Sequence, residues 1–117
     1  MVSQPNMKLW NPMCNEIYAA RLEDMLKEHN TLIVSTNTCG YCHKAKALLE
    51  HYNIKYNEIK LDEIYGLDQM EVANCIYGKE RRFVPQIYMG DKKIGGFGEL
   101  YDMHKKGMFT KEEGSQL

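Results

Sequence analysis

Two cysteines separated by two residues, Cys39 and Cys42, are the side chains of this 117-residue chain whose types and spacing most directly suggest chemistry. They lie in "STNTCGYCHKAKALLEHY" (residues 35–52), where an apolar stretch gives way to a helical pattern. Such a pair can be half of a metal site, a structural disulfide or a working redox couple. The choice among the three decides most of what the sequence says about function.

The remaining cysteines and histidines give little support to a metal site. A zinc site needs about four ligands, and Cys14, Cys75 and the four scattered histidines form no second pair at ligand spacing. We interpret Cys75, inside "EVANCIYG", as a structural residue of a helix rather than a third redox partner. Cys14 is interpreted as a free thiol near the N-terminus, open to intermolecular oxidation.

The position of the pair favours a redox couple. Disulfide exchange needs a thiolate with a free path of approach. Cys39 falls just ahead of the predicted helix, where unpaired backbone N–H groups and the helix dipole stabilise an anion and lower the pKa of a thiol. Cys42, one turn into the helix, is expected to be more buried and suits a resolving thiol. His43 is interpreted as a solvated side chain rather than a general base.

Composition and charge exclude several other classes of function. A net charge of −1 and a pI near 6.4 argue against a protein that binds the phosphate backbone of nucleic acids. The sequence has no run of about 20 apolar residues, and "MVSQPNMKLWNPM" lacks the pattern of a secretory or transit peptide. We therefore expect a cytoplasmic, reducing location, where a CxxC pair is more often catalytic or metal-binding than a static cross-link.

The elements that must position the pair follow from the hydrophobic periodicity. We expect an irregular lead-in over residues 1–13, a candidate mobile segment, and one domain over residues 14–117. The order αβαβαββα implies an α/β fold with a four-stranded mixed sheet flanked by helices. The predicted helices are 15–29, 42–52, 67–77 and 99–106, and the predicted strands are 31–36, 54–61, 86–89 and 93–94.

Three motifs in this order resemble the glutaredoxins, a family of oxidoreductases with the thioredoxin-like fold. They are "TCGYC" opening a helix, "FVP" ahead of a hairpin and "GGFGEL" opening the last helix. The resemblance runs from about Asn15 to the C-terminal region. Tyr41 between the cysteines, and the absence of a Trp before them, favour a glutaredoxin over a thioredoxin with its usual WCGPC.

The resemblance implies a groove for glutathione beside Cys39. Pro85 matches the family's cis-proline, which lets the backbone of Val84 pair with a bound thiol peptide; the alternative is a trans proline that starts an edge strand. Arg82 falls where the family has an arginine that clamps the glycyl carboxylate, although basic residues in a loop are usually just solvated. Tyr41 would lie along the groove, or be an ordinary surface aromatic.

The last motif implies the other end of the groove. Gly96 and Phe97 match the region that holds the γ-glutamyl end of glutathione at a helix start. Glu99 matches the family's acidic residue that meets the ammonium of glutathione. On residue type alone, a glycine-rich bend with Glu99 as an ordinary first-turn acid explains this stretch about equally well.

The sequence departs from the family's pattern at three positions. Thr36 replaces the lysine three residues before the nucleophile and removes one expected contact to the glycyl carboxylate. Phe83 replaces the threonine of TVP, a change we discount because the backbone of Val84 makes the important contacts. Gly40 replaces the usual proline between the cysteines, and glycine lets another backbone or a ligand approach Cys39 closely.

The resemblance implies a glutathione-dependent thiol–disulfide oxidoreductase. Cys39 would attack glutathione mixed disulfides and protein disulfides, and Cys42 would resolve the mixed disulfides formed with proteins. The implied partners are glutathione, as co-substrate, and glutathionylated or disulfide-containing proteins, with no nucleic acid or membrane partner and the chain acting as a monomer.

Two alternatives remain open. Because of Gly40, the chain can instead belong to those glutaredoxins that bind a [2Fe–2S] cluster between two protomers, with Cys39 and glutathione as ligands. It can also be a thioredoxin-like donor that a reductase reduces directly, although Tyr41 and the Gly95–Gly96 pair speak against this.

Overall fold

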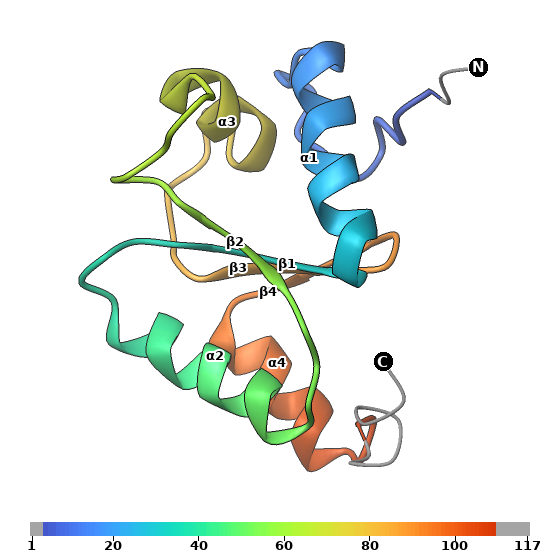
Figure 1. Cartoon of the computed structure of the whole chain (residues 1–117), viewed down its shortest axis with the longest axis vertical. Helices are drawn as coiled ribbons and strands as arrows, with labels where there is room; N and C mark the ends of the chain where they lie inside the picture. The colour runs from blue at the N-terminus through green and yellow to red at the C-terminus, as the bar shows by residue number, and fades with distance from the viewer. Residues whose placement is uncertain (1–3, 110–117) are drawn as a thin grey trace.

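Helices and strands follow one another along the chain in the predicted order αβαβαββα. The computed structural model describes residues 4–109 and shows one four-stranded sheet with helices on both faces (Figure 1). The predicted α/β fold, with a four-stranded mixed sheet flanked by helices, is therefore confirmed. The elements are α1 (Glu16–His29), β1 (Thr31–Ser35), α2 (Gly40–His51), β2 (Asn57–Lys60), α3 (Gln69–Ile76), β3 (Gln86–Met89), β4 (Lys92–Gly95) and α4 (Phe97–Lys105).

β1 is one of the two inner strands of the sheet, as its run of apolar and β-branched residues predicts. The strand order is β2-β1-β3-β4; β1 runs parallel to β2 and antiparallel to β3, and β3 and β4 form a hairpin. All five residues of β1 are buried. Their side chains alternate between the two faces: Leu32 and Val34 pack in the core below α1 and α3, and Ile33 packs with α2 and α4. Figure 1 shows the two helix pairs on opposite sides of the sheet.

Local hydrogen bonds explain where the elements begin and end differently from the prediction. β2 begins at Asn57 rather than residue 54, because Asn57 is paired with Leu32 of β1. The N–H of Ile54 instead donates to the carbonyl of Leu49 at the end of α2. α4 begins two residues earlier than predicted because the carboxylate of Glu99 accepts the N–H of the N-cap residue Gly96 at 2.7 Å and so satisfies a backbone donor at the start of the helix.

The described part of the lead-in contains no helix or strand, but it packs on the core. Leu9 and Trp10 are buried, with only 3% of Trp10 exposed, and the Trp10 ring centroid lies 4.9 Å from that of Tyr88. Cys14 and Cys75 form a disulfide that ties this segment to α3. The interpretation of Cys14 as a free thiol is therefore wrong, and Cys75 lies in a helix, as predicted.

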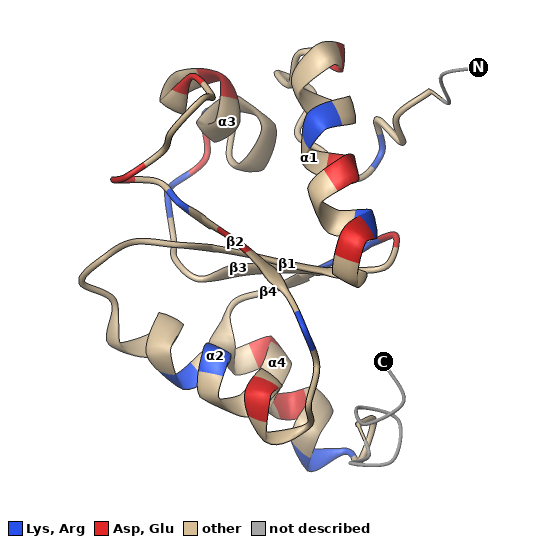
Figure 2. Cartoon of the chain, viewed as in Figure 1, with Lys and Arg blue, Asp and Glu red and all other residues tan. Residues whose placement is uncertain are grey.

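Charges of both signs are spread along the ribbons. Figure 2 shows Lys and Arg interspersed with Asp and Glu over the described helices rather than gathered at one end. This agrees with the small net charge of −1. Of the helices within residues 4–109, none has the length and hydrophobicity that crossing a membrane requires.

Candidate active site

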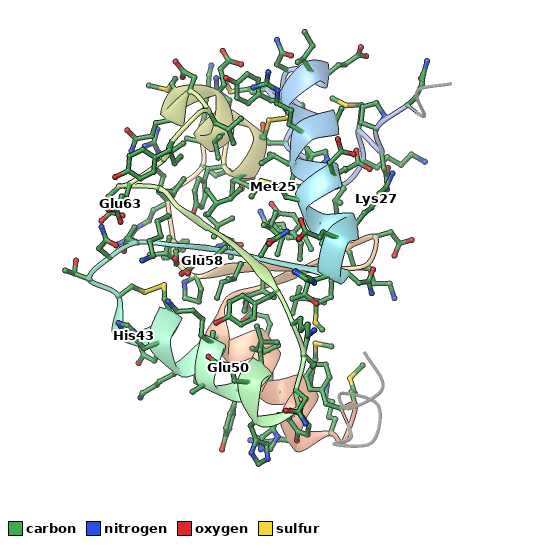
Figure 3. The ribbon with its side chains drawn as sticks, in the orientation of Figure 1. Met25, Lys27, His43, Glu50, Glu58 and Glu63 are labelled. Atoms are coloured by element: carbon green, nitrogen blue, oxygen red, sulfur yellow. A yellow bond between two sulfur atoms is a disulfide. The ribbon has the colours of Figure 1, made fainter. Side chains whose placement is uncertain are left out.

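The start of α2 positions the cysteine pair. Cys39 is the N-cap of this helix, and its Sγ accepts the backbone N–H of Cys42 at 3.1 Å. Cys39 is half-buried, whereas Cys42 is only 1% exposed. The predicted difference in burial is therefore confirmed. His43 is exposed on the first turn of α2 (Figure 3), which agrees with its interpretation as a solvated side chain.

Cys39 and Cys42 are joined as a disulfide in this structure, with their Cα atoms 5.2 Å apart. The pair can therefore close within one helical turn, as a redox couple must. Within residues 4–109, no group of three or more His, Cys, Asp or Glu side chains lies together in a way that could hold a metal ion.

Hydrogen bonds to β2 and to the loop that follows it hold the stretch of chain that leads from β1 to Cys39. Both carboxylate oxygens of Asp62 accept the N–H of Asn37, at 3.1 and 3.0 Å. The hydroxyl of Ser35 and the ammonium of Lys46, on α2, both donate to Glu58 Oε2, at 2.5 and 2.9 Å. Figure 3 shows Glu58 on the α2 side of the sheet. Burial raises the pKa of Glu58, but these two donors more than offset it and hold the pKa below its usual value.

A groove of about 410 Å³ lies next to the cysteine pair; its lining includes Tyr41 and Val84 but not Cys39 itself. The Val84–Pro85 peptide bond, which forms part of the groove, is cis, as the resemblance to the family implies. Cys39 Sγ lies 3.8 Å from the carbonyl oxygen of Val84. The start of α4 supplies another part of the wall. The lining residues are Tyr41, Phe83, Val84, Pro85, Gln86, Gly96, Phe97, Gly98 and Glu99.

Most of the predicted binding residues meet in this groove, but Arg82 does not. Tyr41 packs against Phe97 with ring centroids 5.9 Å apart, although the two residues are 56 positions apart in the sequence. Arg82 is exposed and is absent from the lining; its guanidinium Nη2 lies 4.0 Å from Met70 Sδ on α3. Thr36 is half-buried and also lies outside the lining residues.

Phe83 is a groove residue that the sequence reasoning set aside. Its side chain is 57% exposed and lines the groove, with the guanidinium carbon of Arg81 5.1 Å from its ring centroid. Its carbonyl oxygen accepts hydrogen bonds from the Tyr77 hydroxyl at 2.5 Å and from Gln86 Nε2 at 3.3 Å. The sequence signal for this residue was a large aromatic side chain next to Val84. It was overlooked because only the backbone of Val84 was considered.

Glu99 has a structural task as well as a place in the groove. Its carboxylate caps the start of α4 through the N–H of Gly96. It also packs against Gly95, whose φ is +116°, and an added Cβ there would lie 3.1 Å from Glu99 Cδ. Capping therefore occupies one carboxylate oxygen of Glu99. Because Glu99 also lines the groove, its carboxylate lies beside any ligand bound there.

Comparisons with known proteins agree with this geometry. A family model described as Glutaredoxin matches residues 31–94. The chain is 32% identical over 83 residues to glutaredoxin 1 of Rickettsia conorii, covering 71% of this chain and 79% of the relative. A buckwheat glutaredoxin–glutathione complex matches with a TM-score of 0.60 and 25% identity, over 74% of this chain and 78% of that one. A wheat glutaredoxin, at a TM-score of 0.68, 21% identity and coverage of 83% and 90%, supports the fold.

Proposed function

The chain belongs to the glutaredoxin family of thiol–disulfide oxidoreductases, and we propose that it reduces glutathione mixed disulfides and protein disulfides with glutathione as its co-substrate. The observation that carries the proposal is the position of the Cys39 sulfur. This sulfur lies at the start of a helix, beside a groove, and within bonding reach of a second thiol.

The first step is attack by reduced Cys39. Its thiolate forms a new S–S bond to one sulfur of the substrate disulfide, and the other sulfur leaves as a thiolate that takes a proton from water. The N–H of Cys42, 3.1 Å from Cys39 Sγ, and the start of α2 stabilise the negative charge before the attack. Burial of Cys42 leaves Cys39 as the thiol that substrates reach first.

The second step differs between the two substrates. With a glutathione mixed disulfide, Cys39 takes the glutathionyl group; a second glutathione thiolate then attacks that group, so that glutathione disulfide forms and Cys39 leaves as a thiolate. With a protein disulfide, the Cys42 thiolate attacks the Cys39 sulfur and releases the protein thiol. The product is the Cys39–Cys42 disulfide, which two further glutathione molecules reduce.

Two parts of the groove support glutathione as its occupant. The Val84 backbone beside Cys39 Sγ suits strand-like pairing with a thiol peptide. The first turn of α4, from Phe97, offers backbone N–H groups that favour a carboxylate. The similar buckwheat structure is described as a glutathione complex. Arg82 would have to turn away from Met70 to clamp a second carboxylate.

Turnover of a glutathionylated peptide and of a protein disulfide by the same variants tests the two roles. We expect Cys42→Ser to keep most peptide deglutathionylation and to lose most protein-disulfide reduction, because only the second reaction needs a resolving thiol. Cys39→Ser should abolish both. His43→Ala, an exposed neighbour of Cys42, serves as the control and should leave both rates unchanged. Equal losses in the two assays for Cys42→Ser would contradict the assignment.

The dependence on glutathione needs its own experiment. We expect turnover to fall steeply when glutathione is replaced by cysteine at the same thiolate concentration, because cysteine lacks the glutamyl and glycyl groups that the groove would hold. Equal rates with the two thiols would contradict the proposed dependence on glutathione, although the chain would still be a thiol–disulfide oxidoreductase. The [2Fe–2S] alternative stays a prediction; a brown dimer after anaerobic purification with glutathione would favour it, and a colourless monomer would count against it.

A further inference from the structure

A second disulfide, far along the sequence from the active pair, has no part in the proposed reaction. Cys14 and Cys75 are 61 residues apart in the sequence, and their Cα atoms lie 4.0 Å apart. Cys14 is 7% exposed, and Cys75, within α3, is fully buried. The bond therefore joins the segment before α1 to a helix on the same side of the sheet (Figure 1).

Residues 4–14, which we term the N-terminal clasp, also reach the end of α3 through hydrogen bonds. The N–H of Asn11 donates to the carbonyl of Cys75 at 2.9 Å, and Asn11 Nδ2 donates to the carbonyl of Tyr77 at 3.0 Å. Gly78 makes this approach feasible, because an added Cβ there would lie 2.5 Å from Asn11 Cγ. The disulfide and the two hydrogen bonds thus hold the same end of α3 against the clasp.

The other anchor of the clasp is Trp10, which is the only tryptophan of the chain. Its ring packs on Tyr88, and its Nε1–H donates to Glu23 Oε2 on α1 at 3.4 Å. The same oxygen accepts the N–H of Asn6 at 2.8 Å. A shift of the clasp would change the surroundings of this indole, so that its fluorescence reports directly on the clasp.

The end of α3 is in turn connected to the groove. Tyr77, the C-cap residue of α3, is buried, and its hydroxyl donates to the carbonyl of Phe83 at 2.5 Å. Phe83 lines the groove, and the carbonyl oxygen of the next residue, Val84, lies 3.8 Å from Cys39 Sγ. A continuous series of contacts therefore runs from the second disulfide to the reactive sulfur.

We propose that Cys14 and Cys75 are a second redox site, whose oxidation locks the N-terminal clasp and thereby holds Phe83 and Val84 in the shape that binds substrate. The oxidant is a low-molecular-weight disulfide such as glutathione disulfide. One cysteine thiolate attacks this disulfide, forms a mixed disulfide with it and releases one small thiolate. The other cysteine thiolate then attacks the protein sulfur of the mixed disulfide and releases a second small thiolate. Two thiols are oxidised, one disulfide is reduced to two thiols, and the protons pass to the released thiolates.

The effect on the groove is one of positioning. With the disulfide reduced, the clasp keeps its hydrogen bonds and buried side chains, so that the fold persists but the end of α3 is held less firmly. Tyr77 then fixes the Phe83 carbonyl less well. Because this part of the inference rests on the proposed function, we expect it to appear as a higher KM for a glutathionylated peptide, by roughly 2- to 30-fold, with kcat nearly unchanged.

The redox site is tested without any enzyme assay. Cys39→Ser/Cys42→Ser leaves Cys14 and Cys75 as the only cysteines of the chain. We expect its reduced form, mixed with glutathione disulfide, to form an intramolecular disulfide that mass spectrometry detects, together with a change in Trp10 emission. Free thiols or a glutathionylated product that persists at equilibrium would overturn the proposal, whatever the catalytic activity of the wild type.

Kinetics of two matched variants test the link to the groove. Cys14→Ser/Cys75→Ala removes the disulfide, whereas Tyr77→Phe keeps it and removes only the hydrogen bond to Phe83. Both should raise KM and keep kcat, and only the first should change Trp10 emission. An unchanged KM in Tyr77→Phe would overturn the link even if the double variant folds poorly. No turnover in the wild type would instead refute the proposed function and leave the redox site standing.

Discussion

Removal of the Cys14–Cys75 disulfide is expected to lower the free energy of unfolding by about 4 kcal/mol. The bond spans 61 residues, and in the chain-entropy model a loop of that length restricts the unfolded chain by about this amount. Cys39–Cys42 closes a loop of only three residues, for which the same model gives about 2 kcal/mol. The bond with no part in the proposed reaction should therefore be the stronger contributor to stability.

Thermal unfolding of oxidised proteins provides the assay. For a chain of 117 residues, about 4 kcal/mol corresponds to a Tm lower by about 15 °C. The change is made as Cys14→Ser/Cys75→Ala, because alanine avoids placing a hydroxyl at the fully buried position. Far-ultraviolet circular dichroism follows the whole fold, and Trp10 fluorescence follows the N-terminal clasp.

The matched control is Cys39→Ser/Cys42→Ser, which removes the short loop instead. Its Tm should fall by about half as much. A larger fall in the control, or an unchanged Tm in Cys14→Ser/Cys75→Ala, would refute the reasoning that loop length sets the contribution of each bond. Coincident transitions by the two probes would show that the clasp unfolds together with the rest of the domain.

Three further predictions concern single side chains. Tyr88→Phe should leave the free energy of unfolding unchanged or raise it by about 1 kcal/mol in urea titrations, because the buried Tyr88 hydroxyl has no hydrogen-bond partner among the described residues; a loss of 2 kcal/mol or more would contradict this. Glu58→Gln should lose about 1 kcal/mol at pH 7. The folded pKa of Glu58 lies below its usual 4.5, so that its contribution is present above that pH and is lost as the pH falls through the folded pKa; an equal loss at pH 3 would argue against the charge. Gly40→Pro should fold with an unchanged or higher Tm, because this first helical position has open space for a side chain; a clearly lower Tm would show that the N–H of Gly40 is needed.

Local patterns were sufficient for most of the fold. The mostly apolar, β-branched run of β1 forms an inner, fully buried strand, and the helical spacing of Leu22 and Leu26 places both in the core below α1. Boundaries were less accurate, because they depend on partners that periodicity does not contain. β2 begins where Leu32 pairs with Asn57, and α4 begins where its capping carboxylate reaches back.

The candidate site also contains features that the sequence predicted and features that it did not. The CxxC pair at a helix start was predicted from a short motif, because a few neighbouring residues fix it. The cis proline of FVP was predicted only from the resemblance of all three motifs to the family. The position of Arg82 outside the groove was not, because a long side chain in a loop has several partners within reach, and Met70 on α3 is one of them. The exposure of Phe83 depends in the same way on its surroundings in the folded chain.

The sequence by itself determined the family of the protein, the position of the CxxC pair and the order of the elements, because these depend on residues close together in the chain. Only the tertiary structure decided that Cys14 meets Cys75 and that Tyr77 holds the carbonyl of Phe83. The physical reason is that such contacts depend on how α1, α3 and the sheet pack together. No spacing in the sequence encodes a meeting across 61 residues.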